Sequence, residues 1–301
     1  YLKGRFFLNR RKEEDVKRSI EYFQQAIDKD PDYTLAFCGI ADALTVLPYY
    51  GSVAPREAWS RGVEAALEAL KRDDLLAEAH TSLGMCKTIS YEFADAEKAF
   101  KRALELNPDY ANAHHWYSNL LMYLGRFEES FAEIKRALSL DPLVLIFNRD
   151  LGELFYYSRQ YDKAIEQYQK TLEIDPNFVY VHLDLGLAYL QKSMPEEAMK
   201  EIQKENSDAW LAIGYAAIGN SVMAQQLLKK LERRQKSEHI SPYVLAILGS
   251  LLGDNDRAFK WLEDAYRELN PWLIYLKSEP LFDNLRLDPR FISLLKRMGL
   301  D

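Results

Sequence analysis

The sequence of 301 residues has only two cysteines, Cys38 and Cys86. Two cysteines provide neither a disulfide framework nor the C-x-x-C spacing of a structural zinc site. Both lie in helix-like stretches at positions that suit small apolar side chains, so we expect buried, structural thiols. Glycine (13) and proline (11) are also scarce. Their scarcity argues against a β protein with many turns.

Long apolar runs are absent too, since none approaches the about 20 residues that a transmembrane helix needs. No signal peptide is visible in the first residues. Positive charge is in deficit, with a formal net charge of −7 and a pI of about 5.5. Nucleic-acid binders usually present a basic face, and an anionic membrane repels an acidic protein, so we expect neither partner. Free thiols without a signal peptide favour the cytoplasm.

The motifs of common enzymes are missing: we find no G-x-S-x-G, H-E-x-x-H, G-x-x-x-x-G-K-[ST] or G-x-G-x-x-G. Acidic and basic residues alternate at helical spacing, which is typical of a solvated helix face. His114 and His115 are neighbours, and neighbours on a helix point about 100° apart, so they do not form an i, i+4 metal pair. We assign His114 to a core contact and His115 to a groove position. The sequence therefore predicts no enzyme, no metal site and no cofactor.

What the sequence does have is an internal repeat. Pro108, Pro142 and Pro176 are 34 residues apart, and each ends the same phrase: ALELNPDY, ALSLDPLV and TLEIDPNF. Copies also occur at 26–33 and at 69–76, where aspartate replaces proline. Because proline does not continue a helix, each phrase predicts a helix end. A leucine–glycine pair recurs earlier in the repeat, and its small glycine permits close helix approach; the pairs are Leu83–Gly84, Leu151–Gly152 and Leu185–Gly186.

These phrases resemble the tetratricopeptide repeat (TPR), a 34-residue helix–turn–helix unit. The resemblance implies an all-α fold, a right-handed superhelical solenoid of about eight TPR units over residues 1–271. The second unit carries extra residues around 47–55. The non-repeating residues 272–301 are expected to form a capping segment over the last apolar face. The expected units lie near residues 1–33, 34–76, 77–110, 111–144, 145–178, 179–206, 207–240 and 241–271.

The resemblance also implies a binding surface. In this family the first helix of each unit lines a concave face that holds a peptide or a partner helix. Amides, an arginine and tyrosines suit such recognition, although tyrosine at helical spacing also suits packing. A carboxylate clamp known in the family is incomplete here, because its lysine positions hold Thr81 and His115. The matching positions are Asn112, His115, Asn119, Tyr123, Arg149, Glu153, Tyr156, Tyr157, Asp184 and Leu187.

Longer phrases, at 1–11, 112–130, 148–167 and 271–291, resemble the C-terminal TPR region of prokaryotic multidomain signalling proteins. Those proteins carry winged-helix, nucleotide-cyclase or Ser/Thr-kinase effectors before the repeats. The resemblance implies a fragment that serves as a non-catalytic protein- or peptide-binding scaffold.

Two alternative functions stay open. The first is a self-association module that dimerises its parent protein through the open first helix, with Leu2, Phe6 and Phe7. The second is a small-molecule sensor that uses the concave groove. Its walls would be Trp116, Tyr123, Tyr156 and Tyr157.

Overall fold

The structure is a computed structural model that describes residues 1–50, 53–235 and 237–301. Over these residues it contains helices and no strands, which confirms the predicted all-α repeat fold. The chain divides into two compact units, Tyr1–Phe147 and Asn148–Asp301, and each is described by itself below. Of the insertion predicted at 47–55, Gly51 and Ser52 lie outside the described residues.

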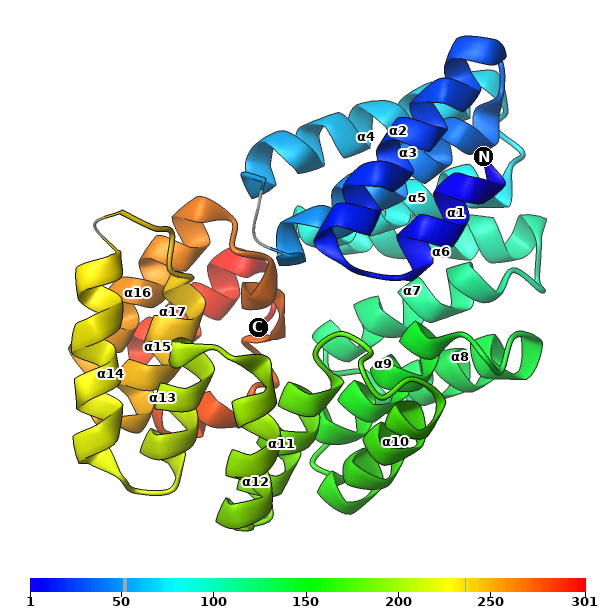
Figure 1. Cartoon of the computed structure of the whole chain (residues 1–301). Helices are drawn as coiled ribbons and strands as arrows, with labels where there is room; N and C mark the ends of the chain where they lie inside the picture. The colour runs from blue at the N-terminus through cyan, green and yellow to red at the C-terminus, as the bar shows by residue number, and fades with distance from the viewer. Residues whose placement is uncertain (51–52, 236) are drawn as a thin grey trace. The chain divides into compact units, whose positions relative to one another are not determined.

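The first unit is a series of antiparallel helix pairs, in which each pair packs on the next (Figure 1). A 3₁₀ turn, η1 (Leu47–Tyr50), follows the third helix. The helices are α1 (Leu2–Asn9), α2 (Glu13–Lys29), α3 (Thr34–Val46), α4 (Pro55–Arg72), α5 (Ala77–Ile89), α6 (Phe93–Leu106), α7 (Ala111–Tyr123) and α8 (Phe127–Leu140).

The second unit continues the pattern and then departs from it. Most of α9 (Leu145–Tyr157) belongs to this unit. After α16 the chain forms two 3₁₀ turns and one last helix: η3 (Pro271–Tyr275), η4 (Pro280–Leu285) and α17 (Pro289–Met298). The helices before them are α10 (Tyr161–Ile174), α11 (Val181–Gln191), α12 (Pro195–Ile202) with η2 (Gln203–Glu205), α13 (Asp208–Ala217), α14 (Ser221–Arg234), α15 (Pro242–Leu251) and α16 (Asn255–Glu268).

The predicted helix ends are confirmed, because α2, α6, α8 and α10 each stop two residues before the proline of their phrase. In α4 the same stop occurs without proline. There the Asp73 carboxylate accepts a hydrogen bond from the backbone N–H of Leu75 at 3.0 Å. Asn107 and Asp175 make the same turn, with the N–H groups of Asp109 and Asn177 as donors. An acid or amide side chain that satisfies the turn is thus the shared device, and proline reinforces it.

Both cysteines are buried and free, as predicted. Sγ of Cys86 lies 3.4 Å from the hydroxyl of Thr45. Burial raises the pKa of Cys86 to about 12, against the lowering effect of the Thr45 hydrogen bond. Burial likewise raises the pKa of Cys38. Both thiols therefore stay protonated and unreactive at neutral pH.

The glycines of the leucine–glycine pairs fit against large side chains of the paired helix. A Cβ atom added at Gly84 of α5 would lie 2.7 Å from Cε1 of Phe100, which is buried. At Gly62 of α4 the nearest atoms to such a Cβ are 3.5 Å away, which is ordinary contact. The two sites therefore provide a matched pair of glycine-to-alanine changes in one unit.

We expect Gly84→Ala to lower the free energy of unfolding by about 1–3 kcal/mol, because the added methyl group overpacks the helix pair. Gly62→Ala should raise it by about 0.5–1 kcal/mol, since alanine favours a helix over glycine. Urea unfolding followed by circular dichroism measures both changes. Equal effects of the two substitutions would contradict the close-approach role of Gly84.

Candidate functional site

One face of α9 carries four predicted site residues of the second unit at spacings of three and four residues, Arg149, Glu153, Tyr156 and Tyr157, while Asp184 and Leu187 lie on α11. Arg149 lies at its centre. Its Nη2 donates to Oε1 of Glu153 at 2.6 Å, and its Nε donates to Oδ2 of Asp184 on α11 at 2.8 Å. Oδ1 of Asp150 lies 3.5 Å from Nη1. The structure thus brings Arg149, Glu153 and Asp184 together; the first two are buried, and the Asp184 side chain is 12% exposed.

Three carboxyl groups share one guanidinium in this cluster, and their pKa values follow from that imbalance. Burial raises the pKa of Asp184 to about 6, although Arg149 lowers it. Burial raises the pKa of Glu153 well above its ordinary range. For Arg149, burial lowers the pKa, but Asp184 and Glu153 raise it more, so the guanidinium stays charged. The Arg149 guanidinium therefore stays protonated, and Asp184 and Glu153 bind protons more tightly than exposed carboxyl groups do.

The chain's own C-terminal segment, defined here as residues 271–285, covers this face. The ring of Tyr275 stacks on that of Tyr157, with centroids 4.9 Å apart and planes at 27°. The Tyr275 hydroxyl donates to Oε2 of Glu153 at 3.3 Å. The indole of Trp272 meets the ring of Tyr180 edge-on at 5.4 Å. Aromatic groups of the segment therefore occupy the place where the sequence predicted a partner.

Glu279 fixes the middle of the C-terminal segment. The hydroxyls of Tyr156 and Tyr243 donate to its two carboxyl oxygens, each at 3.4 Å, and the Leu281 N–H donates at 3.1 Å. Burial raises the pKa of Glu279 to about 7, against the lowering effect of these hydrogen bonds. Further along, Arg159 binds both carboxylate oxygens of Asp283, at 2.7 and 2.8 Å.

These contacts correct two expectations. The capping segment covers the last helix pair, with Phe282 and Leu285 buried, but it also reaches the α9 face. The groove expected there is closed in this conformation, and Tyr156 is only 3% exposed. The physical reason is complementarity, since the segment supplies the aromatic rings and the acceptor that the tyrosines require. Partner contact by Arg149, Glu153, Tyr156, Tyr157, Asp184 and Leu187 stays a prediction.

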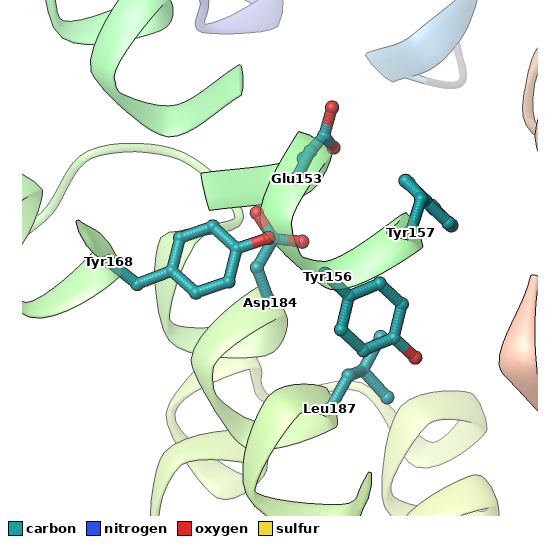
Figure 2. A pocket seen from close by; sticks show the side chains of 6 residues that line it. All are labelled: Glu153, Tyr156, Tyr157, Tyr168, Asp184 and Leu187. Carbon is teal, nitrogen blue, oxygen red and sulfur yellow. The ribbon is translucent and has the colours of Figure 1, made fainter. Parts of the chain in front are cut away.

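A small cavity remains beside this network (Figure 2). The ring of Tyr168, from α10, points toward Asp184, while α9 contributes the other aromatic walls. The cavity volume is about 10 Å³, which is room for about one water molecule. This space does not suit a metabolite, so it does not favour a small-molecule sensor. The lining residues are Glu153, Tyr156, Tyr157, Tyr168, Asp184 and Leu187.

In the first unit, α7 holds the other predicted residues. His115 is fully buried, and its ring lies 4.6 Å from that of Phe147. Asn119 is buried beside it, with Nδ2 3.4 Å from Nε2 of His115. Tyr123 is buried as well, and Asn112 is half-buried. Only Asn112 of these four predicted residues is therefore substantially accessible.

The structure buries His115, which was assigned to a groove position, and covers most of His114, which was assigned to a core contact. The His114 side chain is 12% exposed, its Nδ1 is 2.5 Å from a carboxylate oxygen of Glu133, and its Nε2 is 2.9 Å from the Pro108 carbonyl oxygen. Burial lowers the pKa of His114, but the hydrogen bonds with Glu133 and Pro108 outweigh burial, so the net shift of the pKa is upward. His115, in contrast, packs into the core. His114 thus contacts polar groups of its own helix pair, whereas packing against Phe147 removes His115 from an open groove.

The sequence interpretation missed a polar cluster that joins three helices of the first unit. Asp42 of α3 accepts from Nη1 of Arg5 at 2.7 Å and from the hydroxyl of Ser82 at 2.6 Å. Tyr110 lies beside it: burial is the main cause of its raised pKa, Asp42 raises the pKa further, and a hydrogen bond with Asn112 lowers it. The sequence contained an indication of this cluster: Asp42 is the only charged residue in 34–46, and a charged side chain in an apolar helix requires polar partners.

Comparison with known proteins identifies the repeats. Residues 89–143 match the family model described as tetratricopeptide repeat, and residues 152–193 match the model described as TPR repeat. The chain therefore carries tetratricopeptide repeats, as the phrases predicted.

Solved structures show the same fold. Human IFIT1, solved as a dimer with PPP-AAAA, is 16% identical, with a TM-score of 0.59 over 85% of this chain and 69% of that one. Cut9–Hcn1, from the APC/C hetero-tetramer, is 17% identical, with a TM-score of 0.53 over 76% of this chain and 45% of that one. At such identities the likeness concerns the fold alone.

One relative is a bacterial transcriptional regulator. The transcriptional regulator HilA of Salmonella typhimurium is 25% identical over 130 residues, which are 43% of this chain and 24% of HilA. The match thus spans about a quarter of the length of that relative. It agrees with the predicted resemblance to the repeat region of bacterial regulators.

None of the helices in the described residues combines the length and apolarity that crossing a membrane requires. Within 1–50, 53–235 and 237–301, no three His, Cys, Asp or Glu side chains gather as metal ligands would.

Proposed function

We propose that the chain is a protein-binding scaffold and forms the regulatory region of a larger prokaryotic signalling protein. TPR proteins are typically protein-interaction scaffolds, and their folds are generally non-catalytic. The repeats at 89–143 and 152–193 support the first part of the proposal. The match to a transcriptional regulator supports the second part. In this proposal a bound partner changes the activity of an effector that is linked to the repeats.

We place the partner on the first-helix face of the first unit, defined as the side formed by α1, α3, α5 and α7. One observation carries this choice. Polar side chains on this face, Arg5, Asp42 and Asn112, remain partly exposed, whereas the C-terminal segment covers the α9 face of the second unit. Backbone groups of an extended segment pair well with such amide and charged side chains.

The test uses the whole chain as bait in a lysate of its source, beside two variants of the same repeat. Asn112→Arg places a bulky charge on the first-helix face. Ala132→Arg, on α8, places the same charge at an exposed position outside it. We expect the wild type and Ala132→Arg to hold a partner that Asn112→Arg loses by at least about tenfold, the loss that about 1.4 kcal/mol of binding free energy produces.

Circular dichroism spectra and melting curves that match the wild type are the control for folding. Equal capture of the partner by Asn112→Arg and the wild type would show that the partner does not bind this face. Capture of a second copy of the chain alone would favour the self-association module instead. That alternative has support from α1, where Leu2 is 79% and Phe6 61% exposed. Exposed apolar side chains grouped on one helix are a common contact for another copy.

A further inference from the structure

The turn between α1 and α2 holds two neighbouring arginines in different environments. Arg10 forms an ion pair with Asp15 at 3.1 Å, and its side chain is 47% exposed. Arg11 adopts a left-handed backbone conformation, with φ of +56°, and the residue is only 7% exposed. One arginine is thus a surface group, and the other is held inside the unit.

Arg11 has no acid to pair with among the residues that the structure describes. Its Nε is buried and has no hydrogen-bond partner. Its guanidinium lies over the ring of Trp116 on α7, with 5.8 Å from Cζ to the ring centroid. Two other arginines differ, since the partly exposed Arg5 binds Asp42 and the buried Arg149 binds Glu153 and Asp184.

A buried Nε–H without an acceptor is unfavourable, because burial removes water and no protein group replaces its hydrogen bond. The cation–π contact with Trp116 compensates in part, but it supplies no acceptor for this N–H group. An oxyanion would supply one. A single guanidinium balances the single charge of a carboxylate, whereas a phosphate dianion would remain half neutralised in a chain whose net charge is −7.

We propose that Arg11 and Trp116 form a binding site for a carboxylate of a protein partner. The carboxylate belongs to an extended segment, either as an Asp or Glu side chain or as the chain terminus. The guanidinium donates to its oxygens, and the indole contacts the adjacent apolar atoms. This site rests on the proposed function, because Trp116 belongs to α7 on the first-helix face, and it adds the chemical class of the ligand.

The test selects random eight-residue peptides with free C-termini, displayed on phage, on the wild-type chain. The strongest binder is then synthesised in three forms: unchanged, with its acidic residues changed to the amides, and with an amidated C-terminus. Fluorescence anisotropy gives the affinity of each form for the wild type, for Arg11→Gln and for the matched control Arg10→Gln. Arg10→Gln removes the same charge one residue away.

We expect Arg11→Gln to weaken binding of the unchanged peptide at least about tenfold and Arg10→Gln to change it less than about threefold. One of the two amide forms of the peptide should bind the wild type at least about tenfold more weakly than the unchanged peptide does. The same amide form and the unchanged peptide should bind Arg11→Gln equally, because the Arg11 guanidinium and the peptide carboxylate act as a pair. Loss with the side-chain amides identifies Asp or Glu as the source, and loss with the amidated terminus identifies the chain end.

A second measurement separates this site from a structural role. Arg11→Met should raise the melting temperature by about 2–4 °C, because it removes an unpaired buried charge. A structural arginine would lower it, and a fall beyond that of Arg10→Met would overturn the proposal. Peptides that bind regardless of Arg11 would also overturn the carboxylate site while leaving the scaffold function intact. Failure to select any peptide on the wild type would contradict both.

Discussion

Replacement of Arg149 by leucine is expected to lower the free energy of unfolding by about 3–5 kcal/mol at neutral pH. The guanidinium binds Glu153 and Asp184; Arg149 and Glu153 are buried, and the Asp184 side chain is only 12% exposed. Without it, these carboxyl groups and Asp150 repel one another in a medium that solvates charge poorly. The measurement is urea unfolding followed by circular dichroism. The matched control is Arg136→Leu, which removes an exposed ion pair with Asp109 and should cost about 0–1 kcal/mol.

The loss of unfolding free energy in Arg149→Leu should depend on pH. Burial raises the pKa of Asp184 to about 6 and that of Glu153 above its ordinary range, even with the arginine present. Without the guanidinium both groups take up protons at higher pH. The penalty therefore shrinks as the pH falls from about 8 to about 5, because neutral carboxyl groups are cheaper to bury. A loss at pH 8 no larger than that of Arg136→Leu would show that the network does not stabilise the fold.

The repeat fold was predictable because its signals are local. A phrase such as ALELNPDY contains the helix end, the side chain that satisfies the turn and the start of the next helix. Gly84 likewise marks a close approach between helices that are adjacent in sequence. Such features need only the neighbouring residues to take effect, and repetition at 34 residues makes them visible.

The site was predictable only in part, because burial of a first helix depends on what packs against it. The sequence assigned Arg149 and Asp184 to the first helices of successive repeats, and the structure joins their side chains by a hydrogen bond. The histidines show the limit. A shift of one residue turns the direction by about 100°, and the choice between His114 and His115 depended on Glu133 and Phe147. Those partners come from the following helices, outside the local pattern.

The contact of the C-terminal segment with α9 was not predictable from the repeat pattern. Its contacts with α9 join residues more than a hundred positions apart, as Tyr275 with Glu153 and Tyr156 with Glu279. A repeat alignment relates residues at multiples of the repeat, and the segment has no repeat to align. Only one hint exists in the sequence: Glu279 is an acid in the apolar stretch PWLIYLKSEPLF, and a buried acid requires partners.

Glu279→Gln is expected to stabilise the chain at alkaline pH and to leave it unchanged in acid. Burial raises the pKa of Glu279 in the folded state to about 7 from an ordinary value of 4.5. For a carboxyl group whose folded pKa is raised, the proton is bound more tightly in the native state. Its contribution to stability is therefore complete below about pH 4.5 and is lost as the pH rises through about 7. This loss corresponds to about 3 kcal/mol.

Glutamine mimics the protonated acid, because its carbonyl oxygen can accept from Tyr156 and Leu281 as Glu279 does. We expect the variant to match the wild type near pH 4 and to exceed its free energy of unfolding by about 2–3 kcal/mol near pH 8. Urea unfolding over this pH range measures the difference, with Glu173→Gln, at an exposed position of α10, as the control. Parallel pH profiles for wild type and Glu279→Gln would contradict this prediction, because they would show that folding leaves the pKa of the carboxyl group unchanged. A wild type that becomes more stable than the variant as the pH rises would show the opposite shift, with an ionised Glu279 that holds the C-terminal segment to the α9 face.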